Sequence, residues 1–164
     1  FRRNNYEIAG LIHDLLLTPH FWAAENRGVL IKSPVELIVG TARLFSLPIE
    51  DTVQQIGFAR RLGQDLFDPP NVKGWPGGTR WITTATLLDR TQLLHRAIRG
   101  HETGHTRGMV EMGHPSGRIW LETEPLEVVQ ATLLPLPPVE PVMEAEDRRQ
   151  ALHHLVLDPV YQLK

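Results

Sequence analysis

The stretch whose residue types and spacing come nearest to catalysis is HETGHTRGMVE, residues 101–111. His101-Glu102-x-x-His105 matches the zinc-peptidase pattern, in which two histidines one helical turn apart bind the metal and the glutamate polarises its water. Three interpretations follow. They are a metallopeptidase using His101, Glu102, His105 and Glu111; an adventitious or structural metal held by His101, His105, Glu111 or His114; and a solvated polar loop.

The surroundings of this motif favour the polar loop. Gly100, Gly104 and Gly108 lie close together, and each glycine costs a helix about 1 kcal/mol relative to alanine. Arg99 and Arg107 stand where zinc-peptidase helices usually carry uncharged residues. The upstream sequence is helical in pattern, so it offers no edge strand to align a peptide substrate. We therefore expect no cofactor beyond an adventitious zinc, and we lean against an enzyme.

A second candidate site is the loop DPPNVKGWPGGTRWI, residues 68–82. Trp75 and Trp81 offer an aromatic platform beside Asn71, Lys73 and Arg80, and the glycines let a ligand approach the backbone closely. The alternative is a rigid latch, in which the two tryptophans plug a helical core. The sequence leaves both interpretations open.

Composition limits the remaining function classes. The 164 residues are 41% hydrophobic and 22% charged, which is typical of one globular domain. The formal net charge is −2 with scattered basic residues, so we expect no nucleic-acid partner. Cysteine is absent, which excludes disulfides and thiolate catalysis. No apolar run approaches the roughly 18 residues of a membrane span.

Most of the sequence patterns around these candidate residues predict helices. Asn4 and Glu7 have capping-box spacing before an apolar face that starts at Ile8. Thr18-Pro19 predicts a short second helix anchored by Phe21 and Trp22, and Ser33-Pro34-Val35-Glu36 is the strongest helix start. Further helices are predicted at about 49–62, 84–99 and 143–157. The proposed face of the third helix comprises Val35, Ile38, Val39, Ala42 and Phe45, and that of the fifth comprises Leu87, Leu88, Leu94 and Ile98.

The second half of the chain is less regular. Glycines and a proline predict a flexible region at about 100–118, and Gly100 suits the end of the helix before it. Residues 118–123 suit a short strand, and residues 126–134 suit a helix or a strand. Four prolines make 135–141 a stiff connector. The predicted fold is all-α: an orthogonal multi-helix bundle with a long Pro/Gly/Trp loop, or the same bundle with one hairpin or strand pair around 108–134.

One internal echo stands out. IHDLLLTPHF (12–21) matches LHHLVLDPVY (152–161) at His13/His153, Leu15/Leu155, Leu17/Leu157 and Pro19/Pro159, and Phe21 corresponds to Tyr161. Each copy predicts a helix that ends in a corner, where a Thr-Pro or Asp-Pro pair starts the next turn. Duplication and convergent corner chemistry explain this echo equally well.

Two segments carry a family resemblance: KSPVELIVGTAR (32–43) and LGQDLFDPPNVKGWPGGTRWITTATLLDR (62–90). Together with the final LVLDPVYQLK, they resemble the bacterial domain of unknown function 1800 family. The resemblance implies a helical fold, a chain that is the C-terminal part of a longer protein, and an association with exported proteins. The family brings no established activity, so no catalytic residue carries over.

These observations predict one helical domain over residues 1–164 with a structural or recognition role. Through the 68–82 loop it would dock on the N-terminal part of its own protein, on another partner or on a polymeric ligand. The first alternative is that the chain is part of a hydrolase-like enzyme, and that residues upstream of this chain complete its active site. The second alternative is the zinc metallopeptidase. The oligomeric state and the compartment are left open.

Overall fold

The computed structural model describes residues 1–45, 47, 52–102, 117–142 and 147–164. Within these ranges the chain forms seven α-helices and no named strand, so the predicted all-α class is confirmed. The helices are α1 (Ile8–Leu16), α2 (Pro34–Leu44), α3 (Thr52–Arg61), α4 (Thr84–Glu102), α5 (Gly117–Thr123), α6 (Leu126–Leu133) and α7 (Arg148–Leu157). Short 3-10 turns include η2 (Pro19–Trp22), η5 (Gly78–Trp81) and η7 (Pro159–Gln162).

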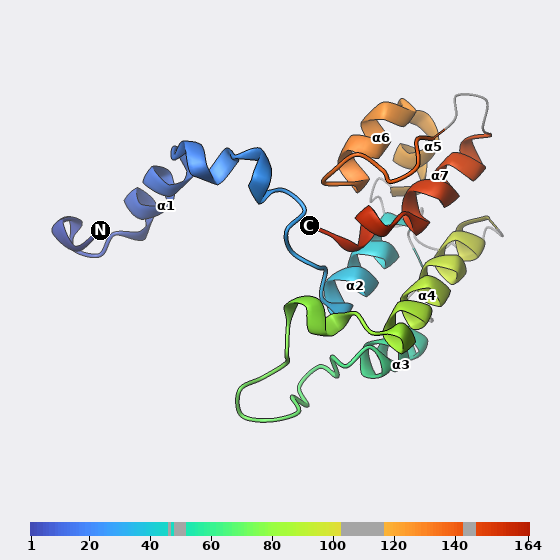
Figure 1. The fold of residues 1–164 in the computed structure, drawn as a ribbon, viewed down its shortest axis with the longest axis horizontal. Helices are drawn as coiled ribbons and strands as arrows, with labels where there is room; N and C mark the ends of the chain where they lie inside the picture. Colours follow the sequence, from blue (N-terminus) through green and yellow to red (C-terminus); the bar gives the residue numbers. More distant parts are fainter. Residues whose placement is uncertain (46, 48–51, 103–116, 143–146) are drawn as a thin grey trace.

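Helices α2 to α7 form a body around one apolar core (Figure 1). Helix α4 packs against α2, α3 and α7, while α6 packs against α7. The core is aliphatic with a few aromatic side chains, and its members exposed to less than 2% are Leu37, Phe45, Leu62, Leu94, Ala97, Leu121, Val129, Leu155 and Val156. Such a core is the main source of stability for a chain of this size.

Helix α2 shows how local sequence fixes a helix start but not its buried face. The Ser33 hydroxyl accepts from the Glu36 N–H, and the Glu36 carboxylate accepts from the Ser33 N–H, which confirms the predicted capping box. The buried face, however, holds Leu37, Ile38, Thr41 and Phe45, whereas Val39 is exposed. The buried face is therefore rotated by part of a turn from the predicted one: it includes Leu37 and Thr41, and the Thr41 hydroxyl lies 3.2 Å from the Tyr161 hydroxyl in the core.

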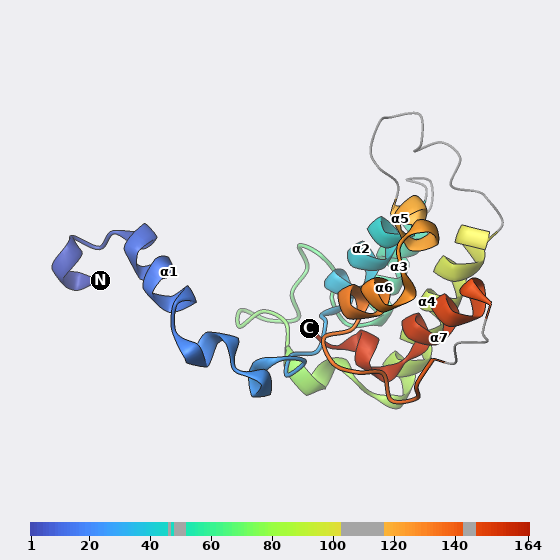
Figure 2. The same cartoon turned by 90° about the horizontal axis from the view of Figure 1, so that it is seen from above.

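The N-terminal segment, residues 1–28, extends away from the body and is called the arm below (Figures 1 and 2). Helix α1 has no buried residue, and neither does η2. The predicted Asn4–Glu7 capping box is wrong, because Asn5 and Tyr6 adopt positive φ and make Glu7 the residue before the helix. Phe21 and Trp22 were predicted as anchors, yet both are exposed. Helix α1 and η2 thus fold locally without burying a side chain against the body.

Three further predictions need correction. Residues 117–123 and 126–133 are helices α5 and α6, so the strand alternative is wrong over the described residues of 108–134. Helix α4 runs through Gly100 to Glu102, because one glycine inside a long, packed helix is tolerated. Residues 103–116 lie outside the described ranges, as does 143–146 at the start of the last predicted helix. Leu87 and Leu88 are exposed, so the buried face of α4 begins further along, at Arg90 and Leu93.

Candidate binding surfaces

The 68–82 loop places its two tryptophans differently. Trp81 ends η5 and is buried in the body at 5% exposure, with its carbonyl accepting from the Thr86 hydroxyl. Trp75 is half-buried, and its indole N–H is enclosed without a hydrogen-bond partner among the described residues. The burial of Trp81 supports the latch interpretation at that position. An enclosed but unpaired N–H at Trp75 is unusual for a purely structural side chain.

The polar candidates of this loop face solvent. Asn71, Lys73 and Arg80 are exposed, and the Asn71 side chain accepts from the Lys73 N–H to form a tight local turn. That turn shapes the loop without occupying the Lys73 or Arg80 side chains. The ligand-site interpretation of Asn71, Lys73, Trp75 and Arg80 therefore stays a prediction.

Next to this loop lies a projecting tip that the sequence did not single out. Phe67 is 96% exposed and has φ of +68°, a conformation that costs a bulky residue about 1–3 kcal/mol. Val72 is fully exposed, and Leu66 is about half-exposed. The segment loops out from the body on the side from which the arm also leaves it (Figure 1). Apolar side chains held outward in this way resemble anchors more than core residues.

The metal-site prediction falls almost entirely outside the described residues. His101 and Glu102 belong to the last turn of α4, while His105, Glu111 and His114 lie outside the described ranges. Among the residues that the structure does describe, no group of three His, Asp or Glu side chains gathers into a metal site. The zinc interpretation of 101–114 is neither supported nor contradicted by these residues.

Two cations, the buried Arg90 and the half-buried Lys32, join the segment by which the chain enters the body to the segment that ends the chain. This cluster is called the cationic latch below. Arg90 is fully buried, and its guanidinium donates to the Lys32 carbonyl at 2.9 Å and to the Gln162 amide oxygen at 3.0 Å. Its Nε has no partner among the described residues, and none of their carboxylates pairs with it. Burial lowers the pKa of Arg90 to about 10. The latch is held by carbonyl acceptors rather than by an ion pair.

Lys32 supplies the second cation of the latch. Its ammonium donates to the Tyr161 carbonyl at 2.6 Å and lies 4.0 Å from the centroid of the Tyr161 ring. Burial lowers the pKa of Lys32 to about 8, and the nearby Glu36 carboxylate opposes that shift. The Tyr161 and Thr41 hydroxyls are 3.2 Å apart, and burial raises the pKa of Tyr161.

The latch joins segments that are distant in sequence. Leu30 and Lys164 exchange backbone hydrogen bonds, and the Lys164 ammonium pairs with Glu36. The Glu36 pKa is lowered, chiefly by that hydrogen bond from Lys164. Sequence reasoning missed this cluster, because no spacing links Lys32, Arg90 and Tyr161. The one available signal was that each lies in a segment that carries the family resemblance.

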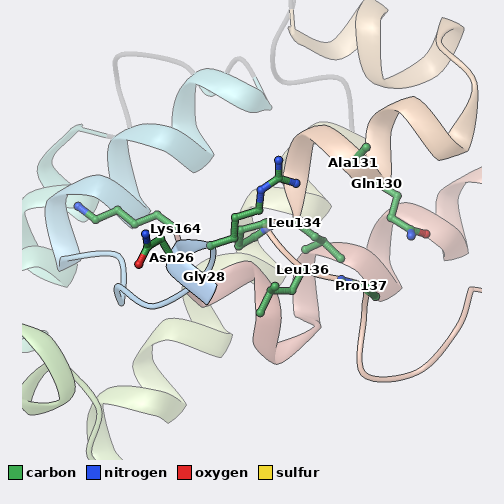
Figure 3. Close-up of a pocket in the computed structure, with 10 residues that line it drawn as sticks. Asn26, Gly28, Gln130, Ala131, Leu134, Leu136, Pro137 and Lys164 are labelled. Carbon is green, nitrogen blue, oxygen red and sulfur yellow. The ribbon is translucent and has the colours of Figure 1, made fainter. Parts of the chain in front are cut away.

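A cavity of about 610 Å³ lies at the base of the arm (Figure 3). Its wall combines the arm residues Asn26, Arg27 and Gly28, the end of α6, the connector from Pro135 to Pro137, and Lys164. Gly28 has φ of +66°, and a Cβ there would lie 2.7 Å from the Leu136 side chain. The arm therefore leaves the body at a point where only glycine fits.

These features define an all-α protein with a buried cationic latch, a projecting loop and an exposed apolar arm. The chain belongs to DUF1800, a family described as proteins of unknown function, whose model matches residues 1–163. Neither the curated proteins nor the solved structures gave a match. In the ranges that the structure describes, no helix is both long and apolar enough to cross a bilayer.

Proposed function

We propose that this domain has a recognition role, docking through its arm and its loop tip on the N-terminal part of a longer protein that contains it. The observation that carries the proposal is the apolar arm. The exposed side chains that we assign to the interface are Leu11, Ile12, Leu15, Leu16, Leu17, Phe21 and Trp22. Such residues are normally buried, and here they share one short segment.

The exposed area fits a protein partner. From their exposed fractions, these seven side chains leave on the order of 700 Å² of apolar surface in water, which is close to the share of one partner in a standard interface. A monomer ordinarily exposes a patch of only a few hundred Å². Arg2, Arg3, Glu7, Asp14, Glu25 and Arg27 balance in charge along the arm. Apolar contact rather than charge is therefore the main attraction.

The loop tip extends the same docking surface. Phe67 and Val72 project from the body without packing on it; Val72 belongs to the 68–82 loop that the sequence predicted to dock, and Phe67 directly precedes that loop. The strained φ of Phe67 is stable only where the surrounding turn enforces it. An exposed aromatic residue held in this way is suited to fill a pocket of the partner as an anchor.

Amide hydrogen exchange tests the proposal. In the 164-residue chain, α1 should exchange quickly, because its apolar face is in water. In a longer protein that includes the N-terminal part, the same amides should exchange at least about 100-fold more slowly. Helix α7 is the internal control, since it is buried and should be protected in both. Equal exchange of α1 in the two proteins would refute the docking role.

A further inference from the structure

The two segments that match in sequence, 12–21 and 152–161, also match in secondary structure. Helix α1 begins at Ile8 and its 3-10 turn spans Pro19–Trp22, while α7 begins at Arg148 and its turn spans Pro159–Gln162. The two units therefore align residue for residue, from Ile8 with Arg148 to Trp22 with Gln162. Thr18 and Asp158, at the two corners, share an extended backbone conformation.

The two units differ in burial rather than in conformation. Leu15 is 52% exposed, whereas its counterpart Leu155 is fully buried. Phe21 is 44% exposed, whereas Tyr161 is 4% exposed. The same contrast holds for Leu11, Ile12 and Leu16 against Ala151, Leu152 and Val156. One face of the motif is thus covered in the C-terminal copy and bare in the arm.

We propose that the arm is a second copy of the α7–η7 unit, and that it docks by the face formed by Leu11, Ile12, Leu15, Leu16 and Phe21. This inference rests on the proposed docking role and adds the docking face and the kind of partner surface. The partner is a helical layer of the N-terminal part, with a groove between helices that matches the groove that α7–η7 fills in this body.

The contacts of α7–η7 define that groove. Helix α7 packs against α4 and α6, and Tyr161 of η7 reaches Thr41 of α2. Aliphatic side chains from these helices, such as Leu94 and Val129, belong to the core that covers α7. The partner groove should therefore be lined by aliphatic residues from at least two helices. Phe21 has no hydroxyl, so its position requires no equivalent of Thr41.

The alignment also identifies an apolar residue at the N-terminal end of α1, on the same face, that we place beyond the end of the docking contact. Ile8 is 63% exposed and aligns with Arg148, whose guanidinium donates to the Leu121 and Glu124 carbonyls at the edge of the body. A residue at this position meets polar backbone rather than the aliphatic core. Ile8 is thus a control that matches Leu15 in exposure and apolar character but differs in predicted role.

The test compares Leu15→Gln and Phe21→Gln with Ile8→Gln in the longer protein, with α1 amide exchange as the measurement. Glutamine preserves helix propensity at positions 8 and 15, so the helix itself should persist. We expect Leu15→Gln and Phe21→Gln each to lose at least about 10-fold of the protection, because each buries a polar amide in an apolar groove. Ile8→Gln should change the protection by less than about 3-fold.

Three other outcomes would each contradict the repeat inference, the docking role or the inferred partner. If Ile8→Gln removes protection while Leu15→Gln and Phe21→Gln retain it, the arm docks through the N-terminal end of α1 instead of the inferred contact, and the repeat inference fails alone. If wild-type α1 is unprotected in the longer protein, the docking role and the inference fail together. If α1 in the 164-residue chain becomes protected as its concentration rises, the occupant is a second copy of the chain, and the inferred partner is wrong.

Discussion

Leu15 and Leu155 occupy equivalent positions of a repeated motif, so identical substitutions at the two sites isolate the effect of tertiary packing. Leu155 is fully buried in the core, and Leu15 is half-exposed on the arm. We expect Leu155→Ala to destabilise the protein strongly and Leu15→Ala to have almost no effect. Both helices lose the same atoms, so helix propensity cancels from the comparison.

The magnitude follows from burial. Truncating a buried leucine removes the transfer free energy of its methyl groups and leaves a cavity, which together cost about 2.7–5 kcal/mol. Leu155 has no exposed surface through which the site can relax, so about 3–4 kcal/mol is expected. At Leu15 the side chain already contacts water, and the change should stay within about 0.5 kcal/mol. In a domain of this size, 3 kcal/mol lowers Tm by about 6–12 °C.

Urea unfolding, followed by tryptophan fluorescence and circular dichroism, measures both values. The slope of the free energy of unfolding against urea should stay the same in both variants, because the surface exposed on unfolding hardly changes. A loss below about 1 kcal/mol for Leu155→Ala would refute the assignment of α7 to the core. A loss above about 2 kcal/mol for Leu15→Ala would show that the arm packs within this chain, contrary to the structure.

Three further outcomes are expected. Trp81→Ala should lower the free energy of unfolding by about 3–5 kcal/mol, whereas Phe67→Ala at the exposed tip should leave that free energy unchanged or raise it. Equal losses in urea unfolding would contradict the structural role of Trp81 in the 68–82 loop. Between pH 8 and 10 the unfolded chain keeps Lys32 protonated while the folded chain releases that proton, so stability should rise with pH by roughly 1–2 kcal/mol after solvent screening. Lys32→Met should flatten that rise in urea unfolding measured across the same range, and an unchanged slope would refute the burial of the ammonium. Ser33→Ala should cost about 1 kcal/mol of stability through the lost cap, whereas Thr18→Ala should cost less, because the Thr18 hydroxyl donates to the Leu15 carbonyl instead of capping η2; similar losses would contradict this difference.

Local features were predictable where a few neighbouring residues decide the outcome. The Ser33 capping box and the proline that starts η2 both depend on hydrogen bonds or sterics within one turn. The prediction failed at Asn4–Glu7, where the adjacent Asn5 and Tyr6 take positive φ and displace the helix start. It also failed at 117–123, where an apolar segment without clear periodicity suits a strand as well as a helix.

The sequence by itself determined the all-α class, the start of α2 and the repeated corner, because propensity, capping and proline geometry act within a few residues. Only the tertiary structure decided which copy of the repeat is buried, because burial depends on what lies opposite a face and not on the face itself. The same physical reason explains the cationic latch: Arg90 and Lys32 meet Gln162 and Tyr161 only after the helices have packed. It also explains the two tryptophans of the loop, of which packing drew Trp81 into the core and left Trp75 at its edge.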